Sequence, residues 1–190
     1  LLAAGHTDWA ICGVGLMPFD LGVRDALGAQ DNLYTLVTKD PSGVSEARVV
    51  GSIVQYLYAP DAPDAVLQKL VSPTTRIVSL TITEGGYSVN DATGHFDPQD
   101  EATLADISAF GAEVPRSVLG YIVAALRDRR AAGIPPFTVM SCDNIQANGA
   151  IARIAVLGFA ASVDQELATW ISENVAFPNS MVDRITPATT

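Results

Sequence analysis

An acid and a guanidinium stand side by side near the end of the sequence, at Asp183 and Arg184. They lie within residues 177–187, a segment that also carries phenylalanine, methionine, valine and isoleucine. A disordered tail is polar and poor in large apolar residues, so this composition predicts a packed segment. A charged pair in apolar surroundings must be paired or must face a ligand. By themselves the residues favour a structural ion pair, with a ligand-binding site as the alternative.

Asp20 follows the first predicted strand, in a chain that we expect to form an open parallel sheet. Such sheets bind ligands outside the carboxyl ends of their strands. In dinucleotide-binding folds an acid just past the second strand binds the adenosine ribose, and Asp20 is a candidate for that acid. The alternative is that Asp20 caps the following helix. The preceding Gly13-Val14-Gly15 is a weak phosphate-loop signal, because Pro18 removes an amide that a phosphate cradle needs.

Two more polar residues follow buried strands. Glu84 precedes two glycines, which allow a close backbone approach, so its carboxylate can accept hydrogen bonds from ligand hydroxyls. The alternative is a solvated glutamate in a tight turn. Asn144 can donate its amide to a carbonyl or an alkoxide in the crevice. The alternative is that Asp143 or Asn144 caps the next helix.

The composition restricts the class of protein. The 190 residues are 48% hydrophobic and 17% charged, with a net charge of −10, which fits one globular domain that repels nucleic acid and anionic lipid. No apolar run reaches the roughly 20 residues that span a membrane, so we expect a cytoplasmic protein. The basic residues Arg127, Arg129 and Arg130 are expected at a helix end, where cations suit the last carbonyls.

Cysteine and histidine provide no metal site. Cys12 and Cys142 lie in apolar runs and are predicted to be buried free thiols. His6 and His95 have no cysteine or acidic partner at the spacing of a metal site, so no metal is assigned.

Buried strands alternate with amphipathic helices along the chain, which predicts an α/β fold with a doubly wound, mostly parallel sheet. The first strand, in residues 8–16, is nearly uninterrupted in apolar residues and is expected to be buried on both faces. A loop is predicted for residues 88–99. The other expected strands span residues 33–38, 47–58, 76–82 and 137–142, and helices are expected over 23–30, from 61, over 115–133, 149–161 and 165–173.

Four segments resemble the long-chain polyol dehydrogenase family in order and spacing across essentially the whole chain: residues 9–16, 76–87, 135–144 and 177–187. The resemblance implies a Rossmann-like domain of a zinc-independent enzyme that uses NAD to interconvert a mannitol-like sugar alcohol and a fructose-like ketose. For residues 177–187 the resemblance favours a ligand-binding site over a structural ion pair. The implied roles are catalytic for Asn144, cofactor-binding for Asp20, Glu84 and Val182, and substrate-binding for Asp183.

The sequence departs from this family in what it lacks. Family members carry an upstream strand with a glycine-rich loop and a downstream helical catalytic domain with a general-base lysine, and neither Lys39 nor Lys69 matches that lysine. From the resemblance we expect residues 1–190 to be a truncated cofactor-binding domain, inactive in isolation. Phe19 replaces a second acid of some relatives, which weakens the expected preference for NAD over NADP. The alternatives are a hexuronate reductase or arabinitol dehydrogenase of the same family, or a non-catalytic Rossmann-like binding module.

Overall fold

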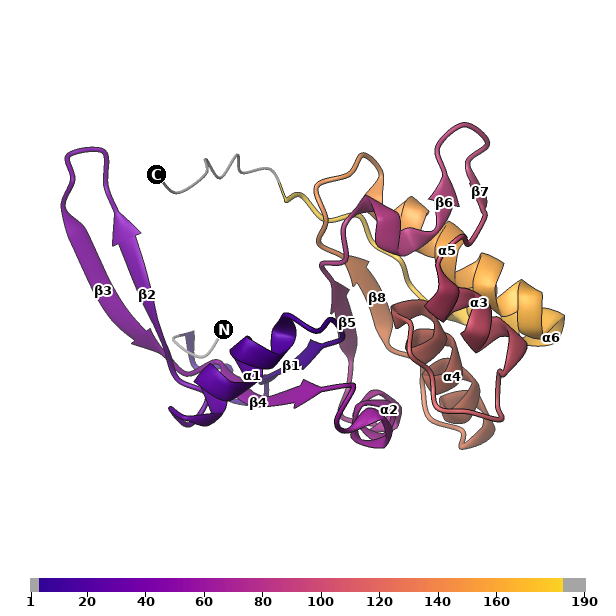
Figure 1. Cartoon of the computed structure of the whole chain (residues 1–190), viewed down its shortest axis with the longest axis horizontal. Coiled ribbons are helices and arrows are strands. Elements are labelled where there is room, and N and C mark those ends of the chain that lie inside the picture. The colour runs from indigo at the N-terminus through magenta and orange to yellow at the C-terminus, as the bar shows by residue number, and fades with distance from the viewer. Residues whose placement is uncertain (1–3, 183–190) are drawn as a thin grey trace. The chain divides into compact units, whose positions relative to one another are not determined.

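The computed structural model describes residues 4–182, which form two compact units, Leu1–Val66 and Leu67–Thr190. The boundary falls within helix α2 (Pro63–Val71). Each unit is built around one parallel pair of strands with an antiparallel hairpin beside it in the sequence (Figure 1).

In the first unit, a parallel strand pair is combined with one helix and one hairpin. Strand β1 pairs with β4 in a register that places Gly13 opposite Tyr56 and Gly15 opposite Tyr58. Strands β2 and β3 form a hairpin that extends away from this pair (Figure 1). Its turn is closed by the Asp40 carboxylate, which accepts the amide hydrogens of Ser42 and Val44. The elements are β1 (Ile11–Gly15), α1 (Asp20–Gly28), β2 (Tyr34–Lys39), β3 (Ser45–Val50) and β4 (Ile53–Tyr58).

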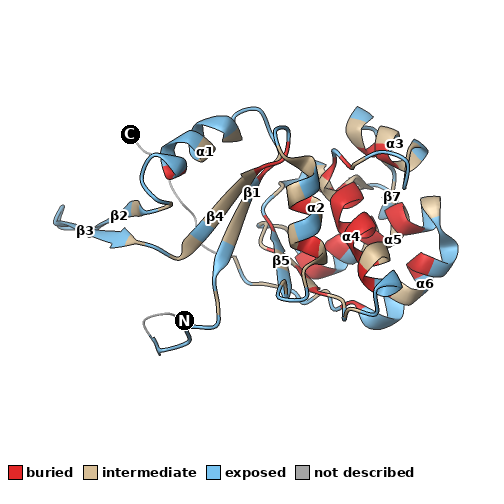
Figure 2. Ribbon diagram, turned by 90° about the horizontal axis from the view of Figure 1, so that it is seen from below, coloured by how far each residue is buried: buried red, intermediate tan, exposed pale blue. Residues whose placement is uncertain are grey.

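The prediction that the first strand is buried on both faces is wrong for this unit. Ile11 and Val14 of β1 keep 52% and 40% of their surface exposed. Within the unit, β1 pairs with β4 and is packed by the single helix α1, which is too little structure to cover both faces of the pair. Figure 2 accordingly shows α1, β2 and β3 as mostly exposed ribbon.

The second unit has the larger core. Strands β5 and β8 run parallel, and Leu80 pairs with Ser141 at their carboxyl ends. Buried residues concentrate in α4 and α5 (Figure 2), where Ile122 and Phe159 are at most 1% exposed. Its elements after α2 are β5 (Ile77–Leu80), η2 (Glu84–Tyr87), β6 (Val89–Asn90), β7 (His95–Phe96), α3 (Glu101–Ser108), α4 (Val118–Ala131), β8 (Thr138–Ser141), α5 (Asn148–Val163) and α6 (Gln165–Asn174).

Two predicted segments differ from the structure because local turns divide them. The single strand expected over residues 47–58 is split at Gly51 into β3 and β4, as the chain leaves the hairpin to pair with β1. The loop expected over residues 88–99 contains the β6–β7 hairpin, and Asn90 Oδ1 accepts the amides of two following residues to close its turn.

The short helix α3 was not predicted, and it begins where the Asp100 carboxylate accepts the amide of Thr103.

The arginine cluster ends a helix, as predicted, and Arg129 within it is only 2% exposed. Its Nη1 donates to the carbonyls of Leu70 and Ser72 in and after the last turn of α2, and its Nε donates to Pro135 O, at 2.7–2.8 Å. Burial lowers the pKa of Arg129. This guanidinium therefore joins α2 to the segment that enters β8.

Cys12 and Cys142 are each half-buried, so the prediction that both thiols are buried is wrong, and neither forms a disulfide among residues 4–182. None of the helices within residues 4–182 is long and apolar enough to cross a membrane.

Candidate functional site

Asp20 is the first residue of α1 and lies beside Gly15 of β1. Its Oδ2 accepts the amide hydrogen of Met17 at 2.8 Å, which closes the turn between β1 and the helix. The residue that caps α1 is Phe19, so the capping interpretation of Asp20 is wrong. Asp20 is half-exposed, and within residues 4–182 its Oδ1 has no hydrogen-bond partner. One carboxylate oxygen is therefore available to a ligand.

The glycines of β1 make room for Tyr56 and Asp20. A Cβ added at Gly13 would lie 2.5 Å from the Tyr56 ring, and one at Gly15 would lie 2.5 Å from Asp20 Cβ and 2.6 Å from the Tyr56 hydroxyl. Burial and the nearby Asp20 charge raise the pKa of Tyr56. These contacts give the two glycines a packing role and account for the Gly-x-Gly pattern without a phosphate.

In the second unit, Asp143 joins the loop after β5 to the end of β8. Its carboxylate accepts the amides of Ile82 and Thr83 at 3.1 and 3.0 Å and the hydroxyl of Tyr87 at 2.6 Å. Tyr87 is fully buried, and its hydroxyl is also bonded to Ser141 Oγ at 2.6 Å. Burial and the Asp143 bond raise the pKa of Tyr87, so the hydroxyl stays protonated and donates.

Glu84 and Asn144 each directly follow a residue that takes part in this junction. Glu84 opens η2, directly after Thr83, and Asn144 follows Asp143; both side chains are exposed. Neither Asp143 nor Asn144 caps α5, whose cap is Ala147 in the left-handed conformation, so that interpretation is wrong. Within residues 4–182 neither the Glu84 nor the Asn144 side chain has a hydrogen-bond partner, so both can accommodate a ligand.

The segment before Val182 is clasped to the start of α5 by Asn148, which is 2% exposed. Asn148 Nδ2 donates to Ser180 O at 2.9 Å, and Asn148 Oδ1 accepts the Ser180 amide at 3.0 Å. Ser180 Oγ in turn donates to Ser141 O at the end of β8. The clasp therefore ties the backbone that leads to Val182 to the strand end that carries Asn144.

The predicted packing of the terminal segment is only partly present. Phe177 and Val182 are half-exposed, and Met181 is 93% exposed, so its side chain is not part of an apolar frame. The clasp holds this segment through backbone and amide bonds rather than through apolar burial. Asp183 and Arg184 lie outside the described residues.

Sequence reasoning missed the residues that assemble these sites, above all Tyr56, Tyr87 and Asn148. Asn148-Gly149 at the start of an apolar helix was a usable signal. A Cβ at Gly149 would meet the carbonyl of Phe177 at 2.6 Å, so only glycine admits the clasped segment.

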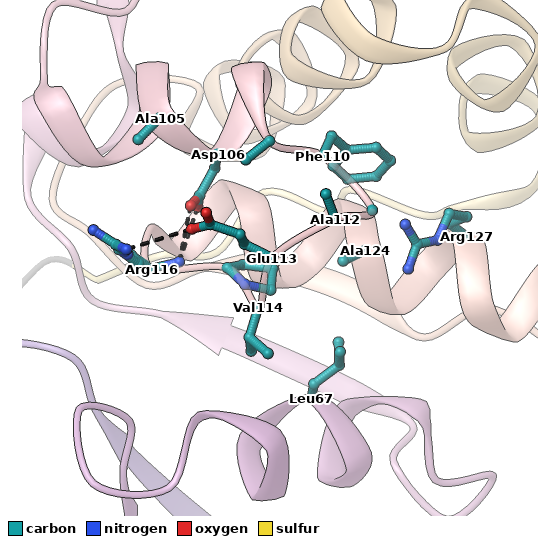
Figure 3. Close-up of a pocket in the computed structure, with 13 residues that line it drawn as sticks. Leu67, Ala105, Asp106, Phe110, Ala112, Glu113, Val114, Arg116, Ala124 and Arg127 are labelled. Atoms are coloured by element: carbon teal, nitrogen blue, oxygen red, sulfur yellow. Dashed lines mark hydrogen bonds and ion pairs between the residues drawn. The ribbon is translucent and has the colours of Figure 1, made fainter.

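A cavity of about 220 Å³ lies apart from these residues, between α3, α4 and the loop that joins them (Figure 3). Of its two acids, Asp106 and Glu113, Asp106 is buried and accepts the amides of Arg116 and Ser117 and the Ser117 hydroxyl. No predicted site residue lines this cavity. Over residues 4–182, no group of three or more histidine, cysteine or acidic side chains could hold a metal ion.

Comparison with known proteins identifies the fold. The family model for the mannitol dehydrogenase Rossmann domain matches residues 1–190, which confirms the predicted fold. The chain is 54% identical over 182 residues to mannitol 2-dehydrogenase of Phaeosphaeria nodorum and 55% identical over 182 residues to polyol:NADP oxidoreductase of Gluconobacter oxydans, covering 96% and 95% of this chain. It superposes with a TM-score of 0.89 and 51% identity on Pseudomonas fluorescens mannitol 2-dehydrogenase, solved as a ternary complex with NAD and D-mannitol, over 96% of this chain.

The match covers only part of these relatives. The chain spans 32% and 37% of the two enzymes matched by sequence and 37% of the Pseudomonas fluorescens chain. It therefore corresponds to about a third of each.

Proposed function

The chain belongs to the mannitol dehydrogenase family, and we propose that it supplies the cofactor-binding part of an NAD-dependent enzyme that interconverts a sugar alcohol and a ketose. The observation that carries this proposal is the junction at Asp143. It brings Glu84 and Asn144 to the carboxyl ends of the paired strands β5 and β8, where folds of this class bind their ligands.

Asp20 fits the adenosine end of NAD. Its half-exposed carboxylate keeps Oδ1 without a partner among residues 4–182, and a ribose hydroxyl can donate to that oxygen. Bound NAD supplies hydride chemistry, which side chains cannot provide. Glu84 is proposed to bind at the edge between cofactor and substrate, and Val182 to contact the nicotinamide.

The proposed roles at the reacting carbon fall to Asn144 and Asp183. Asn144 donates its amide to the oxygen that becomes an alkoxide, and Asp183 orients the other polyol hydroxyls. The alcohol proton needs a base, and the lysines Lys39 on β2 and Lys69 on α2 are not in the loops after β5 or β8. We propose that the base comes from the part of such an enzyme that this chain does not cover.

A hybrid enzyme tests the function. Residues 1–190 replace the matched third of the Pseudomonas fluorescens mannitol 2-dehydrogenase. NADH formation is measured with mannitol and arabinitol, and NADH consumption is measured with hexuronates. We expect turnover with mannitol, while the 190 residues alone turn over at least about 100-fold more slowly because the general base is missing. A folded hybrid that binds NAD but converts none of these substrates would support the binding-module alternative. A preference for arabinitol or a hexuronate would support the related enzymes.

NADP is the second candidate cofactor, because the residue next to Asp20 is Phe19, 74% exposed and neutral, and because one relative is named as an NADP enzyme. Asp20→Asn in the hybrid removes the charge that repels a 2′-phosphate and weakens the bond to the ribose. We expect the ratio of kcat/KM for NAD to that for NADP to fall by about 10- to 100-fold.

Asp25→Asn is the matched control, because Asp25 is an exposed acid on the same helix. In this variant the ratio of kcat/KM for NAD to that for NADP should change by less than about threefold, since long-range surface charge is screened by salt. Equal shifts in the two variants would contradict a specific role for Asp20.

A further inference from the structure

We propose that Asp143 is a positioning residue that locks the loop after β5 onto the end of β8 and so fixes Glu84 and Asn144 relative to each other. This inference rests on the proposed function, because it gives Asp143 its role through those two residues. Asn144 directly follows Asp143 in the chain. The Asp143 carboxylate accepts a hydrogen bond from the amide of Thr83, the residue directly before Glu84.

The lock consists of bonds to two consecutive amides and a phenol. Oδ1 accepts from Thr83, while Oδ2 accepts from Ile82 and from Tyr87, 61 and 56 residues earlier in the chain. Bonds to a charged acceptor are the stronger kind. Within residues 4–182, no lysine or arginine is paired with this carboxylate. Its bonds therefore go to the loop rather than to an ion-pair partner.

The loop adopts a conformation that needs such support. Thr83 has φ +62°, a conformation that is costly for a β-branched residue. Residues held in sparsely populated conformations persist only where their surroundings over-determine them. Two bonds hold this residue, directly before Glu84: its amide donates to Asp143, and its carbonyl accepts from the amide of Gly86.

The other side of Asp143 is held as well. The buried Asn148 donates from Nδ2 to Asp143 O at 3.2 Å while it also binds Ser180. The peptide between Asp143 and Asn144 is thus anchored through its carbonyl, and the Asp143 side chain is anchored through its carboxylate. This double anchoring is what a preorganised amide donor requires.

The test uses Asp143→Asn in the hybrid enzyme. The backbone amides of Ile82 and Thr83 donate to different oxygens of Asp143. The asparagine side chain has an NH₂ group in place of one of these oxygens, so at least one of the two amides loses its acceptor and the loop is released. A misplacement of about 1 Å can cost a factor of 100 in rate, and we expect kcat to fall by about 10- to 100-fold. On the Asn144→Ala background the same change should cost less than about threefold, because residues that act as a unit are not additive.

Asp164→Asn is the matched control. The Asp164 carboxylate also accepts two consecutive amides, those of Glu166 and Leu167, but it does so at the start of α6, so kcat should change by less than about threefold even if the melting temperature falls. Hydrogen exchange separates the inference from the proposed function. Asp143→Asn should speed exchange at the Ile82 and Thr83 amides at least about tenfold, whereas Asp164→Asn should not.

Unchanged exchange at those amides, or the same loss of kcat with and without Asn144, would overturn the positioning role. If Asn144→Ala leaves kcat unchanged, the proposed catalytic role of Asn144 is wrong, while the exchange measurement still decides whether the lock exists.

Discussion

Replacing Asn144 by alanine in the hybrid enzyme is expected to lower kcat by about 100- to 1,000-fold, the usual cost of removing one donor from an oxyanion-stabilising site. The side chain is exposed at the end of β8, and its backbone is anchored through Asp143. An amide that meets the substrate oxygen mainly as charge develops stabilises the transition state more than the ground state. KM for the polyol should therefore change by less than about threefold.

Steady-state kinetics with mannitol and NAD measure this effect. Gln146→Ala is the matched control, because it removes another exposed amide from the same connecting segment. Its kcat should stay within about twofold of the parent, as for a surface change without a specific contact. A rise in KM with kcat unchanged would show that Asn144 binds the substrate uniformly and does not act on the alkoxide.

The strand and helix pattern was largely predictable from the sequence, because buried strands and amphipathic helices leave strong periodic signals. The second unit shows this for α4, α5 and α6, whose expected and observed ranges differ by a few residues. Short elements were missed where a single side chain decides the structure. Helix α3 depends on its Asp100 cap and the β6–β7 hairpin on the Asn90 turn, and eight or fewer residues give little periodicity.

Burial was harder to predict than element type. The apolar residues of β1 predict a strand correctly, but how much of each residue is covered depends on neighbours that periodicity does not specify. Ile11 is half-exposed in a strand whose composition is typical of full burial, and Met181 is almost fully exposed in a segment expected to be packed.

Where Glu84 and Asn144 lie, beyond the ends of β5 and β8, could be predicted because parallel strands release their chains at one edge. Their roles in binding and catalysis stay predictions. What could not be predicted is how they are held, because the bonds join residues far apart in the chain, such as Thr83 with Asp143 and Asn148 with Ser180. A sequence pattern shows that an acid follows a strand, but it does not show whether that acid faces a ligand, caps a helix or binds a neighbouring loop.

Arg129→Met is expected to lower the free energy of unfolding of the second unit by about 2–4 kcal/mol. Methionine retains an unbranched apolar stem, but the carbonyls of Leu70, Ser72 and Pro135 lose their donor. Each buried polar group left unsatisfied costs about 1–3 kcal/mol. The guanidinium also lies over the Phe137 ring, at 5.3 Å from its centroid, and that contact is lost as well.

Urea unfolding of the 190-residue chain, followed by far-ultraviolet circular dichroism, measures this change. Arg130→Met is the matched control, because Arg130 is the next residue of α4, is exposed, and lies 6.0 Å from the centre of the Trp170 ring. An exposed cation–π contact contributes about 0.5–1 kcal/mol, so the loss of unfolding free energy should be severalfold larger for Arg129→Met than for Arg130→Met. Equal losses would show that the carbonyl bonds of Arg129 contribute little beyond the charge of the helix end. A large difference would establish that β8 is anchored at both ends, by Arg129 where the chain enters the strand and by Asp143 where it leaves toward Asn144.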